Sequence, residues 1–249
     1  MSDQECIIDN KEILYQAMRN LIVSVLFCCP LSLGGSDTVD RMAVGWMAAE
    51  RVEADCSQAY EDMGLEACMD WRAFRQAYEG YRQIEHRKEV LTLIDYSKPS
   101  TEERLFVMDM AEHKLLFCSV VAHGRNSGNV YATSFSNEEG SYKSSLGFYR
   151  TESAYRGRNG YSLVLEGLEE GINDAARRRA IVVHGAAYAH PSVAERSGRL
   201  GRSLGCPAVP EALSRPIIDA IKEGSVVYIY ADDPDYKTRS RFFCCISEK

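Results

Sequence analysis

From Leu91 to Tyr230 the chain consists of short apolar runs separated by breaks rich in Gly, Ser and Pro. Runs of this length with frequent breaks are typical of strands rather than of core helices. They lie at residues 91–95, 105–108, 115–121, 148–151, 161–165, 181–183 and 226–230. Many short strands with few helices favour a mostly antiparallel β domain over a parallel α/β sheet. The expected fold class is therefore mainly β, of the α+β type.

A small helical region is expected before the strands. Residues 37–63 carry an apolar stripe at helical spacing, made of Val39, Met42, Ala43, Trp46 and Met47. Ser36 or Asp37 can cap this helix and Gly64 can end it. A second helix is expected over 70–86, with Trp71, Phe74, Tyr78 and Tyr81 on one side. Both faces are interpreted as packing faces against the β domain.

One more helix is expected late in the chain. Ser214-Arg215-Pro216 is expected to open it, with Pro216 in its first turn and Gly224 past its end.

Composition limits the classes of partner. The chain has 249 residues, 45% hydrophobic and 26% charged, enough for one sizeable core and a smaller appendage. The net charge is −7, and no long basic run or basic–aromatic ladder occurs. A nucleic-acid partner is therefore not expected.

The N-terminal segment has the pattern of a signal peptide. Residues 21–29 form the most apolar run, and even when extended to Leu33 they are too short for a comfortable membrane span. Met18-Arg19-Asn20 precedes the run and small residues follow it at Gly34. We expect residues 1–35 to be a signal segment, with Met18 as an alternative start, and no stable membrane span after its removal. The alternative is a buried N-terminal helix.

Nine cysteines are present and none forms a CxxC pair, which gives no support to a zinc ribbon or a thioredoxin-like motif. Six lie beyond the expected signal segment: Cys56, Cys68, Cys118, Cys206, Cys244 and Cys245. In an oxidising compartment Cys56 and Cys68 can bridge two helices; the alternative is that they are free buried thiols. Cys118 lies within an apolar run and is expected to be inert core.

Residues 180–210 contain the best candidate for a chemical site. The apolar run ends at His184-Gly185, and a loop then leads to Gly205-Cys206-Pro207. Gly205 frees the backbone before the thiol and Pro207 fixes φ after it, which suits a cysteine that is presented rather than packed. A nucleophilic thiol needs a base that is close in space. The sequence therefore predicts a Cys/His acyl-transfer site made of Cys206 and His184.

Several segments together resemble a known family. They are Ile94-Asp95-Tyr96-Ser97-Lys98-Pro99-Ser100, Val121-Ala122-His123-Gly124-Arg125-Asn126-Ser127-Gly128, Ser134-Phe135-Ser136-Asn137, His184-Gly185 and Gly201-Arg202-Ser203-Leu204-Gly205-Cys206-Pro207-Ala208-Val209-Pro210. Over roughly residues 91–231 the chain resembles the YkuD-type murein L,D-transpeptidase catalytic domains, in the branch that carries Ser-Leu-Gly-Cys-Pro.

The resemblance implies a β-sandwich-like catalytic domain that forms a cysteine acyl-enzyme. It assigns Cys206 as nucleophile, His184 as general base and the backbone carbonyl of Gly185 as the group that orients the imidazole. The commoner signature has a second His where this chain has Leu204, and Asn or Arg where it has Ala208. These departures concern contacts to the donor peptide.

Further site residues follow from the same resemblance. The backbone N–H groups of Gly205 and Cys206 are expected to hold the oxyanion. The candidates for substrate contacts are Ser203, Arg202, Tyr188, His123 and Arg125, each with an ordinary structural role as its alternative. For Ser203 that alternative is to fix the loop.

The implied activity is peptidoglycan L,D-transpeptidation of tetrapeptide stems, which forms 3→3 cross-links. The alternatives are L,D-carboxypeptidase activity from the same acyl-enzyme and a non-catalytic cell-wall binding module. A further alternative is a zinc site made of His184, His190 and Cys206, but Pro191 lies in the loop and no close ligand pair occurs, so no metal and no cofactor are expected.

The expected partners are peptidoglycan stem peptides, in the periplasm or cell envelope of a bacterium. The expected domains are a signal segment at 1–35, a helical region at 36–90, the catalytic domain at 91–231 and a C-terminal tail at 232–249.

Overall fold

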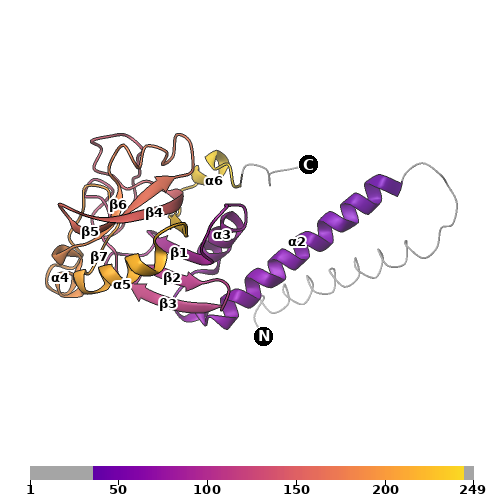
Figure 1. Cartoon of the computed structure of the whole chain (residues 1–249), viewed down its shortest axis with the longest axis horizontal. Coiled ribbons are helices and arrows are strands. Elements are labelled where there is room, and N and C mark those ends of the chain that lie inside the picture. Colours follow the sequence, from indigo (N-terminus) through magenta and orange to yellow (C-terminus); the bar gives the residue numbers. More distant parts are fainter. Residues whose placement is uncertain (1–35, 244–249) are drawn as a thin grey trace, which may run out of the picture. The chain divides into compact units, whose positions relative to one another are not determined.

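The structure, a computed structural model, describes residues 36–243, with side chains omitted for 36–46, 48 and 49 (Figure 1). The described residues fall into two compact units, which divide between Val52 and Glu53. The expected signal segment at 1–35 lies outside the described residues, as do Cys244 and Cys245. No helix in the described part is long and apolar enough to cross a membrane.

Helices precede the sheet, as expected. Helix α2 runs over Ser36–Asp62, and Gly64 follows it with φ +62°, a left-handed conformation that suits glycine. This confirms the helix predicted at 37–63. The packing of its apolar stripe stays a prediction, because the side chains of Val39, Met42, Ala43 and Trp46 lie outside the described part of the chain.

The second helix is shorter than expected. After the 3₁₀ turn η1 (Leu65–Ala67), α3 spans Trp71–Tyr81, and the carboxylate of Asp70 caps it by accepting the N–H of Arg72 at 2.7 Å. Phe74 and Tyr81 are buried on its inner face, which confirms that face as a packing face.

Within residues 36–243, eight strands form one continuous sheet in the order β3-β2-β1-β8-β4-β5-β6-β7. Their bounds are β1 Val90–Asp95, β2 Leu105–Asp109, β3 Lys114–Ser119, β4 Gly147–Gly157, β5 Gly160–Gly167, β6 Val182–Gly185, β7 Ala208–Val209 and β8 Val226–Tyr230. Five of the seven pairings are antiparallel, and β1/β8 and β6/β7 are parallel. The mainly β fold with a helical N-terminal region is confirmed.

The remaining helices are short and lie after β6. They are η2 (Ala187–Ala189), α4 (Pro191–Ser197), α5 (Glu211–Ile221) and α6 (Tyr236–Arg239). The helix expected to open at Ser214 begins instead at Glu211, so Pro216 lies in the helix interior and not in its first turn. Helix α5 packs on β6, the strand that carries His184.

The segment after β8 returns to the core. The buried carboxylate of Glu169 accepts the N–H of Phe148 at 2.6 Å and the hydroxyl of Tyr236 at 2.9 Å. Phe242 and Phe243 are buried, and their rings lie 4.9 and 6.0 Å from that of Phe148. These contacts attach residues 236–243 to the centre of the sheet.

The four cysteines of the described part are free thiols. Cys56 and Cys68 therefore follow the free-thiol alternative, not the bridge. Cys118 is half-buried, and its sulfur lies 3.2 Å from the carboxylate of Glu103.

Candidate active site

His184 lies near the end of β6, between two partner strands. It pairs with Ser162 of β5 and with Ala208 of β7, and its side chain is buried. Its Nδ1 is 2.9 Å from the carbonyl oxygen of Gly185. A carbonyl only accepts, so Nδ1 carries the proton and Nε2 carries the free lone pair. The ring is thereby held in the tautomer that a general base of this kind requires.

Gly185 is in close contact with α5. A Cβ at this position would meet the Oγ of Ser214 at 2.7 Å and its Cβ at 2.8 Å. Only glycine allows the strand and helix to approach this closely. The carbonyl that orients His184 is thus fixed by packing against α5.

Cys206 lies two residues before β7, next to the strand that carries His184. The N–H of Val182 donates to its sulfur at 3.4 Å, and the thiol lies 3.6 Å from the carbonyl of Ala180. The described contacts include no hydrogen bond between the His184 imidazole and the thiol. The fold therefore brings the candidate nucleophile next to β6, the strand of the candidate base, without a hydrogen bond between the two side chains.

The ionisation of both groups is shifted by burial. Burial lowers the pKa of His184, partly offset by the bond to the Gly185 carbonyl. Burial also raises the pKa of Cys206, while the N–H of Val182 and the charge of Arg179 act in the opposite direction. Both shifts favour the neutral forms, so the resting pair is imidazole and thiol rather than imidazolium and thiolate.

Ser203 fixes the turn over residues 203–207, which contains Cys206 and is called the nucleophile turn below. Its hydroxyl donates to the carbonyl of Cys206 at 2.6 Å and accepts the N–H of Gly205 at 3.0 Å. Its own N–H donates to the carbonyl of His123 at 2.9 Å. Of the two roles considered for Ser203, the structure favours fixing the loop over contacting the substrate.

The hydrogen bond to Ser203 also occupies the N–H of Gly205, which was expected to be an oxyanion donor. That bond would have to break before Gly205 could serve an oxyanion. The backbone N–H of Cys206 contributes to lowering the pKa of its own thiol. Gly205 has φ +127°, which explains a glycine here.

Tyr188 lies beside the site on η2. Burial, followed by the neighbouring Cys206, raises the pKa of its phenol to about 12. Gly201 packs against it, since a Cβ there would lie 2.5 Å from the Cβ of Tyr188. This places Tyr188 near the nucleophile.

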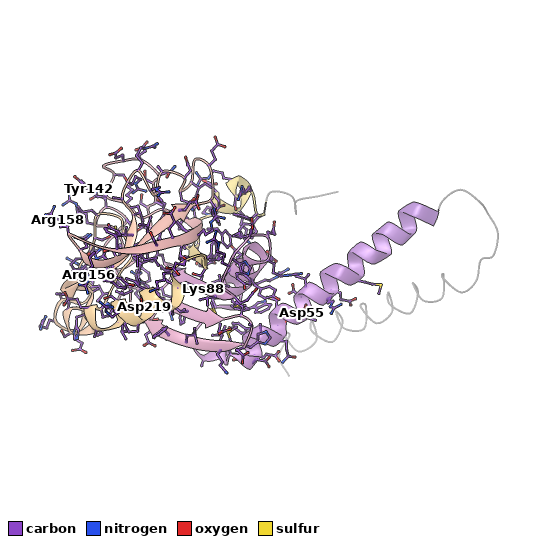
Figure 2. All side chains as sticks on the ribbon, viewed as in Figure 1. Asp55, Lys88, Tyr142, Arg156, Arg158 and Asp219 are labelled. Carbon is purple, nitrogen blue, oxygen red and sulfur yellow. The ribbon has the colours of Figure 1, made fainter. Side chains whose placement is uncertain are left out.

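The two arginines predicted to contact substrate, Arg202 and Arg125, make contacts to the loop over residues 123–147. Arg202 donates to the carbonyls of Arg125 at 3.1 Å and Gly128 at 2.9 Å. The guanidinium of Arg125 lies 4.2 Å above the exposed ring of Tyr142, which is labelled in Figure 2. His123 is buried, and its Nδ1 lies 2.8 Å from Arg104.

The sequence interpretation missed Arg179 and Ala180. The carbonyl of Ala180 faces the thiol, and Arg179 lies next to Gly205. The signal that marks Arg179 in the sequence is weak, because Arg177 and Arg178 stand beside it. The exposed side chain of Leu204, 58% accessible, stands beside the nucleophile where the commoner signature has a second His.

The three residues of the alternative zinc site, His184, His190 and Cys206, are not grouped to hold a metal. His190 is exposed and caps α4, where its Nδ1 accepts the N–H of Ser192 at 3.2 Å. In the described range, no group of three His, Cys, Asp or Glu side chains is placed to hold a metal.

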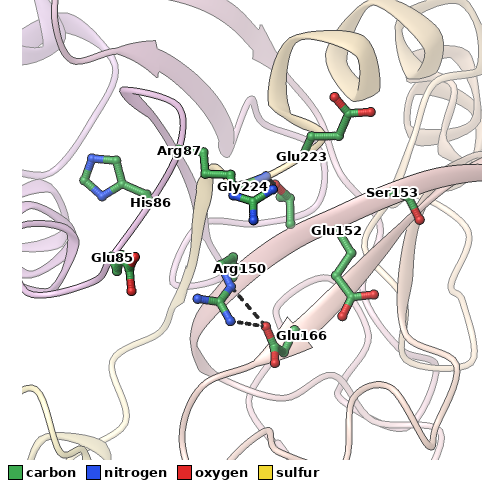
Figure 3. A pocket seen from close by; sticks show the side chains of 10 residues that line it. Glu85, His86, Arg87, Arg150, Glu152, Ser153, Glu166, Glu223 and Gly224 are labelled. Carbon is green, nitrogen blue, oxygen red and sulfur yellow. Dashed lines mark hydrogen bonds and ion pairs between the residues drawn. The ribbon is translucent and has the colours of Figure 1, made fainter.

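A cavity of about 620 Å³ lies away from these residues (Figure 3). Its lining includes His86, Arg87 and Glu223, and in it Arg150 pairs with Glu166 at 2.8 Å. A second cavity of about 330 Å³ is lined by residues of α3 and of the segment after β8. Neither contains His184 or Cys206.

Several solved L,D-transpeptidases overlap with part of the chain. The enzyme from Mycobacterium smegmatis is 13% identical, with a TM-score of 0.36 over 57% of this chain and 59% of that one. The enzyme from Stackebrandtia nassauensis is 14% identical, with a TM-score of 0.35 over 72% and 79%. The chain thus spans about three fifths of the first of these proteins. No curated protein matches the chain.

The model of the L,D-transpeptidase catalytic domain family matches residues 66–230, about two thirds of the chain. This range includes the whole β-sheet and both candidate catalytic residues, His184 and Cys206. The chain therefore belongs to the L,D-transpeptidase catalytic domain family.

Proposed function

We propose that this protein is a peptidoglycan L,D-transpeptidase that acts through an acyl-enzyme on Cys206. One observation carries the proposal. The Cys206 thiol lies beside β6, where the carbonyl of Gly185 holds His184 with its Nε2 lone pair free. A nucleophile, a base and a group that orients the base are the parts that covalent acyl transfer needs.

In the first step the thiol attacks a tetrapeptide stem. The Nε2 of His184 takes the thiol proton as the sulfur bonds to the carbonyl carbon of the L-centre residue. The C–N bond to the terminal D-Ala then breaks, and the proton passes from His184 to the leaving amine. The products are free D-Ala and a thioester on Cys206.

The neutral resting pair suits general-base catalysis. Because burial lowers the pKa of His184 and raises that of Cys206, the proton moves during attack and not before it.

The tetrahedral intermediate carries an oxyanion that needs a donor. The N–H of Cys206 is our candidate, and Pro207 has no N–H to offer. One such donor contributes about 3–4 kcal/mol, a factor of roughly 10²–10³ in rate.

The second step decides the product. An amine from another stem attacks the thioester, forms an amide and returns the thiol, which gives a 3→3 cross-link. Water as acceptor gives L,D-carboxypeptidase activity from the same intermediate. The loop over residues 123–147 lies against the nucleophile turn, and Leu204 of that turn is exposed. We assign the substrate contacts to this loop, Leu204 and Tyr188.

The proposal extends to the localisation and the domain organisation of the protein. We propose that the protein is exported and acts in the periplasm or cell envelope, with stem peptides as its partners. The signal segment at 1–35, the helical region at 36–90, the catalytic domain at 91–231 and the tail at 232–249 are part of this proposal.

Product analysis tests the function. Full-length protein is incubated with purified disaccharide-tetrapeptide, and the products are identified by mass spectrometry. We expect 3→3 dimers and free D-Ala from the wild type, and neither from Cys206→Ala. Tripeptide without dimer would identify a carboxypeptidase, and intact tetrapeptide would indicate a binding module. Dimer formation by Cys206→Ala would refute the nucleophile.

A further inference from the structure

Arg179 is attached to the loop over residues 136–145 by all four of its terminal N–H groups. Its Nη1 donates to the carbonyl of Ser136 at 2.7 Å and to the Oγ of Ser145 at 2.5 Å. Its Nη2 donates to the carbonyl of Lys143 at 2.5 Å and to the Oγ of Ser141 at 3.3 Å. The planar fork of arginine is suited to such a set of acceptors. The guanidinium is therefore fixed in one orientation.

Every one of these acceptors is neutral. Within the described residues, no carboxylate lies at ion-pair distance from Arg179. The two preceding arginines differ, since Arg177 pairs with Glu152 at 2.9 Å and Arg178 lies 4.0 Å from Glu139. A half-buried cation without a counter-ion is costly to maintain. Its charge is available to an anion that forms nearby.

The nucleophile turn is where that anion forms. A Cβ on Gly205 would lie 3.3 Å from the Nη2 of Arg179, so the guanidinium borders the residue before the thiol. The next residue, Ala180, has φ +53°, a conformation that is uncommon outside glycine, and its carbonyl faces the sulfur of Cys206 at 3.6 Å. Chain neighbours of Arg179 thus contact the thiol directly.

We propose that Arg179 is a positioning residue of this site, which holds the loop over residues 136–145 against the nucleophile turn and supplies a fixed positive charge that stabilises the Cys206 thiolate. The proposal deepens the proposed function and rests on it, since it takes Cys206 as the nucleophile. The direction of the charge effect agrees with the lowering of the Cys206 pKa by Arg179. A cation beside a cysteine is a common means of thiol activation.

The hydrogen bonds also argue against a role as substrate anchor. Bidentate capture of a carboxylate needs two parallel N–H donors of one guanidinium. In Arg179 only Nε–H lacks an acceptor among the described residues, because both terminal nitrogens bind the loop. The charge therefore acts on the thiol through space.

Alkylation of Cys206 by iodoacetamide as a function of pH tests the charge without any peptidoglycan. The thiolate is the reacting form, so the rate follows the ionised fraction. We expect Arg179→Gln to alkylate about tenfold more slowly than the wild type at pH 7, with its pH midpoint moved upward, because a neighbouring cation changes thiol ionisation by at least this factor. Peptide mapping confirms that Cys206 carries the label.

Two further variants complete the design. Arg178→Gln removes the same charge one residue away and is expected to alkylate like the wild type. Arg179→Lys keeps the charge but not the fork, so its alkylation rate should stay within about threefold of the wild type while cross-linking falls. Folding of each variant is checked by circular dichroism. If Arg179→Gln is unfolded, Arg179→Lys still tests the proposal.

The results separate the claims. Equal rates and pH profiles for wild type and Arg179→Gln would overturn the proposal, as would an Arg179→Lys rate tenfold below the wild type. If the wild type makes no product from disaccharide-tetrapeptide yet the alkylation results hold, the proposed function fails and the role of Arg179 toward the thiol stands.

Discussion

His123 is buried, and only one of its two ring nitrogens has a hydrogen-bond partner among the described residues. Arg104 can only donate, so the Nδ1 of His123, 2.8 Å from its Nη2, is the acceptor and Nε2 carries the proton. That N–H has no hydrogen-bond partner among the described residues. Burial, followed by the charge of Arg104, lowers the pKa of His123 to about 4. The ring is therefore neutral at pH 7.

This residue makes the protein sensitive to acid. In the unfolded chain the His123 pKa is near 6.5, so between pH 6.5 and 4 the unfolded state binds more protons than the folded state. The free energy of unfolding therefore falls as the pH falls through this window, by about 3 kcal/mol from this residue. We expect His123→Asn to lose less stability over the same window, because Asn can accept from Arg104 and does not titrate.

Urea denaturation of both proteins from pH 7 to pH 4 measures this difference. Each protein is compared with its own value at pH 7, which removes the packing cost of the substitution. Parallel curves for the two proteins would show that His123 does not titrate in this window.

At the scale of single residues the sequence points to candidate reactive groups but not to their surroundings. Cys206 and His184 stand out as candidates because a rigid Gly-Cys-Pro turn and a strand end are local patterns. The hydroxyl of Ser203 and the N–H of Gly205 satisfy each other inside the turn, which depends on exact dihedral angles. The contacts of Arg179 depend on a loop about forty residues earlier in the chain, and no local pattern encodes them.

Among the elements, α5 has the most direct link to the site. It packs on β6 so closely that Gly185 has no room for a side chain, and the carbonyl of that glycine holds the imidazole of His184, the candidate base. Yet Pro216 lies in the helix interior, where it removes one backbone hydrogen bond and crowds the preceding turn. The helix that supports the site therefore carries an internal defect.

Replacing Pro216 by Ala should stabilise the protein. The proline is exposed, so the substitution loses little packing. The restored N–H can bond to the carbonyl of Ala212, and we expect a gain of about 2 kcal/mol after the entropy of the unfolded chain is considered. The measurement is the midpoint of guanidinium denaturation at an unchanged slope.

A matched control is Pro216→Gly. It restores the same N–H but should gain about 1 kcal/mol less than Ala, because glycine is a poorer helix former. An alanine variant no more stable than the wild type would show that the helix accommodates the proline without cost.

The strands were predicted more accurately than the helices. Runs such as 91–95 and 226–230 are buried on both faces and have a continuous apolar signal, which is local. The start of α5 was missed because a proline usually indicates a first turn. Here Pro210 already precedes the helix and the apolar face of Ile217, Ile218 and Ile221 keeps Pro216 inside it.

For the whole molecule, the structure differs most from the sequence-based prediction in the segment after β8. Its sequence is polar until Phe242, and the sequence alone offered no account of that apolar end. The structure places Phe242 and Phe243 on Phe148 and directs Tyr236 to Glu169. Contacts between residues this far apart in sequence leave no periodic trace, so they could not be predicted.

The central claim concerns the whole protein as an enzyme, and it is that Cys206 carries the acyl group. Intact mass spectrometry of the full chain after exposure to a carbapenem tests it most directly, because the strained amide opens on the nucleophile and adds its whole mass. We predict one adduct on the wild type, mapped to Cys206, and none on Cys206→Ala. An adduct of equal extent on Cys206→Ala, or one mapped to another residue, would contradict the account.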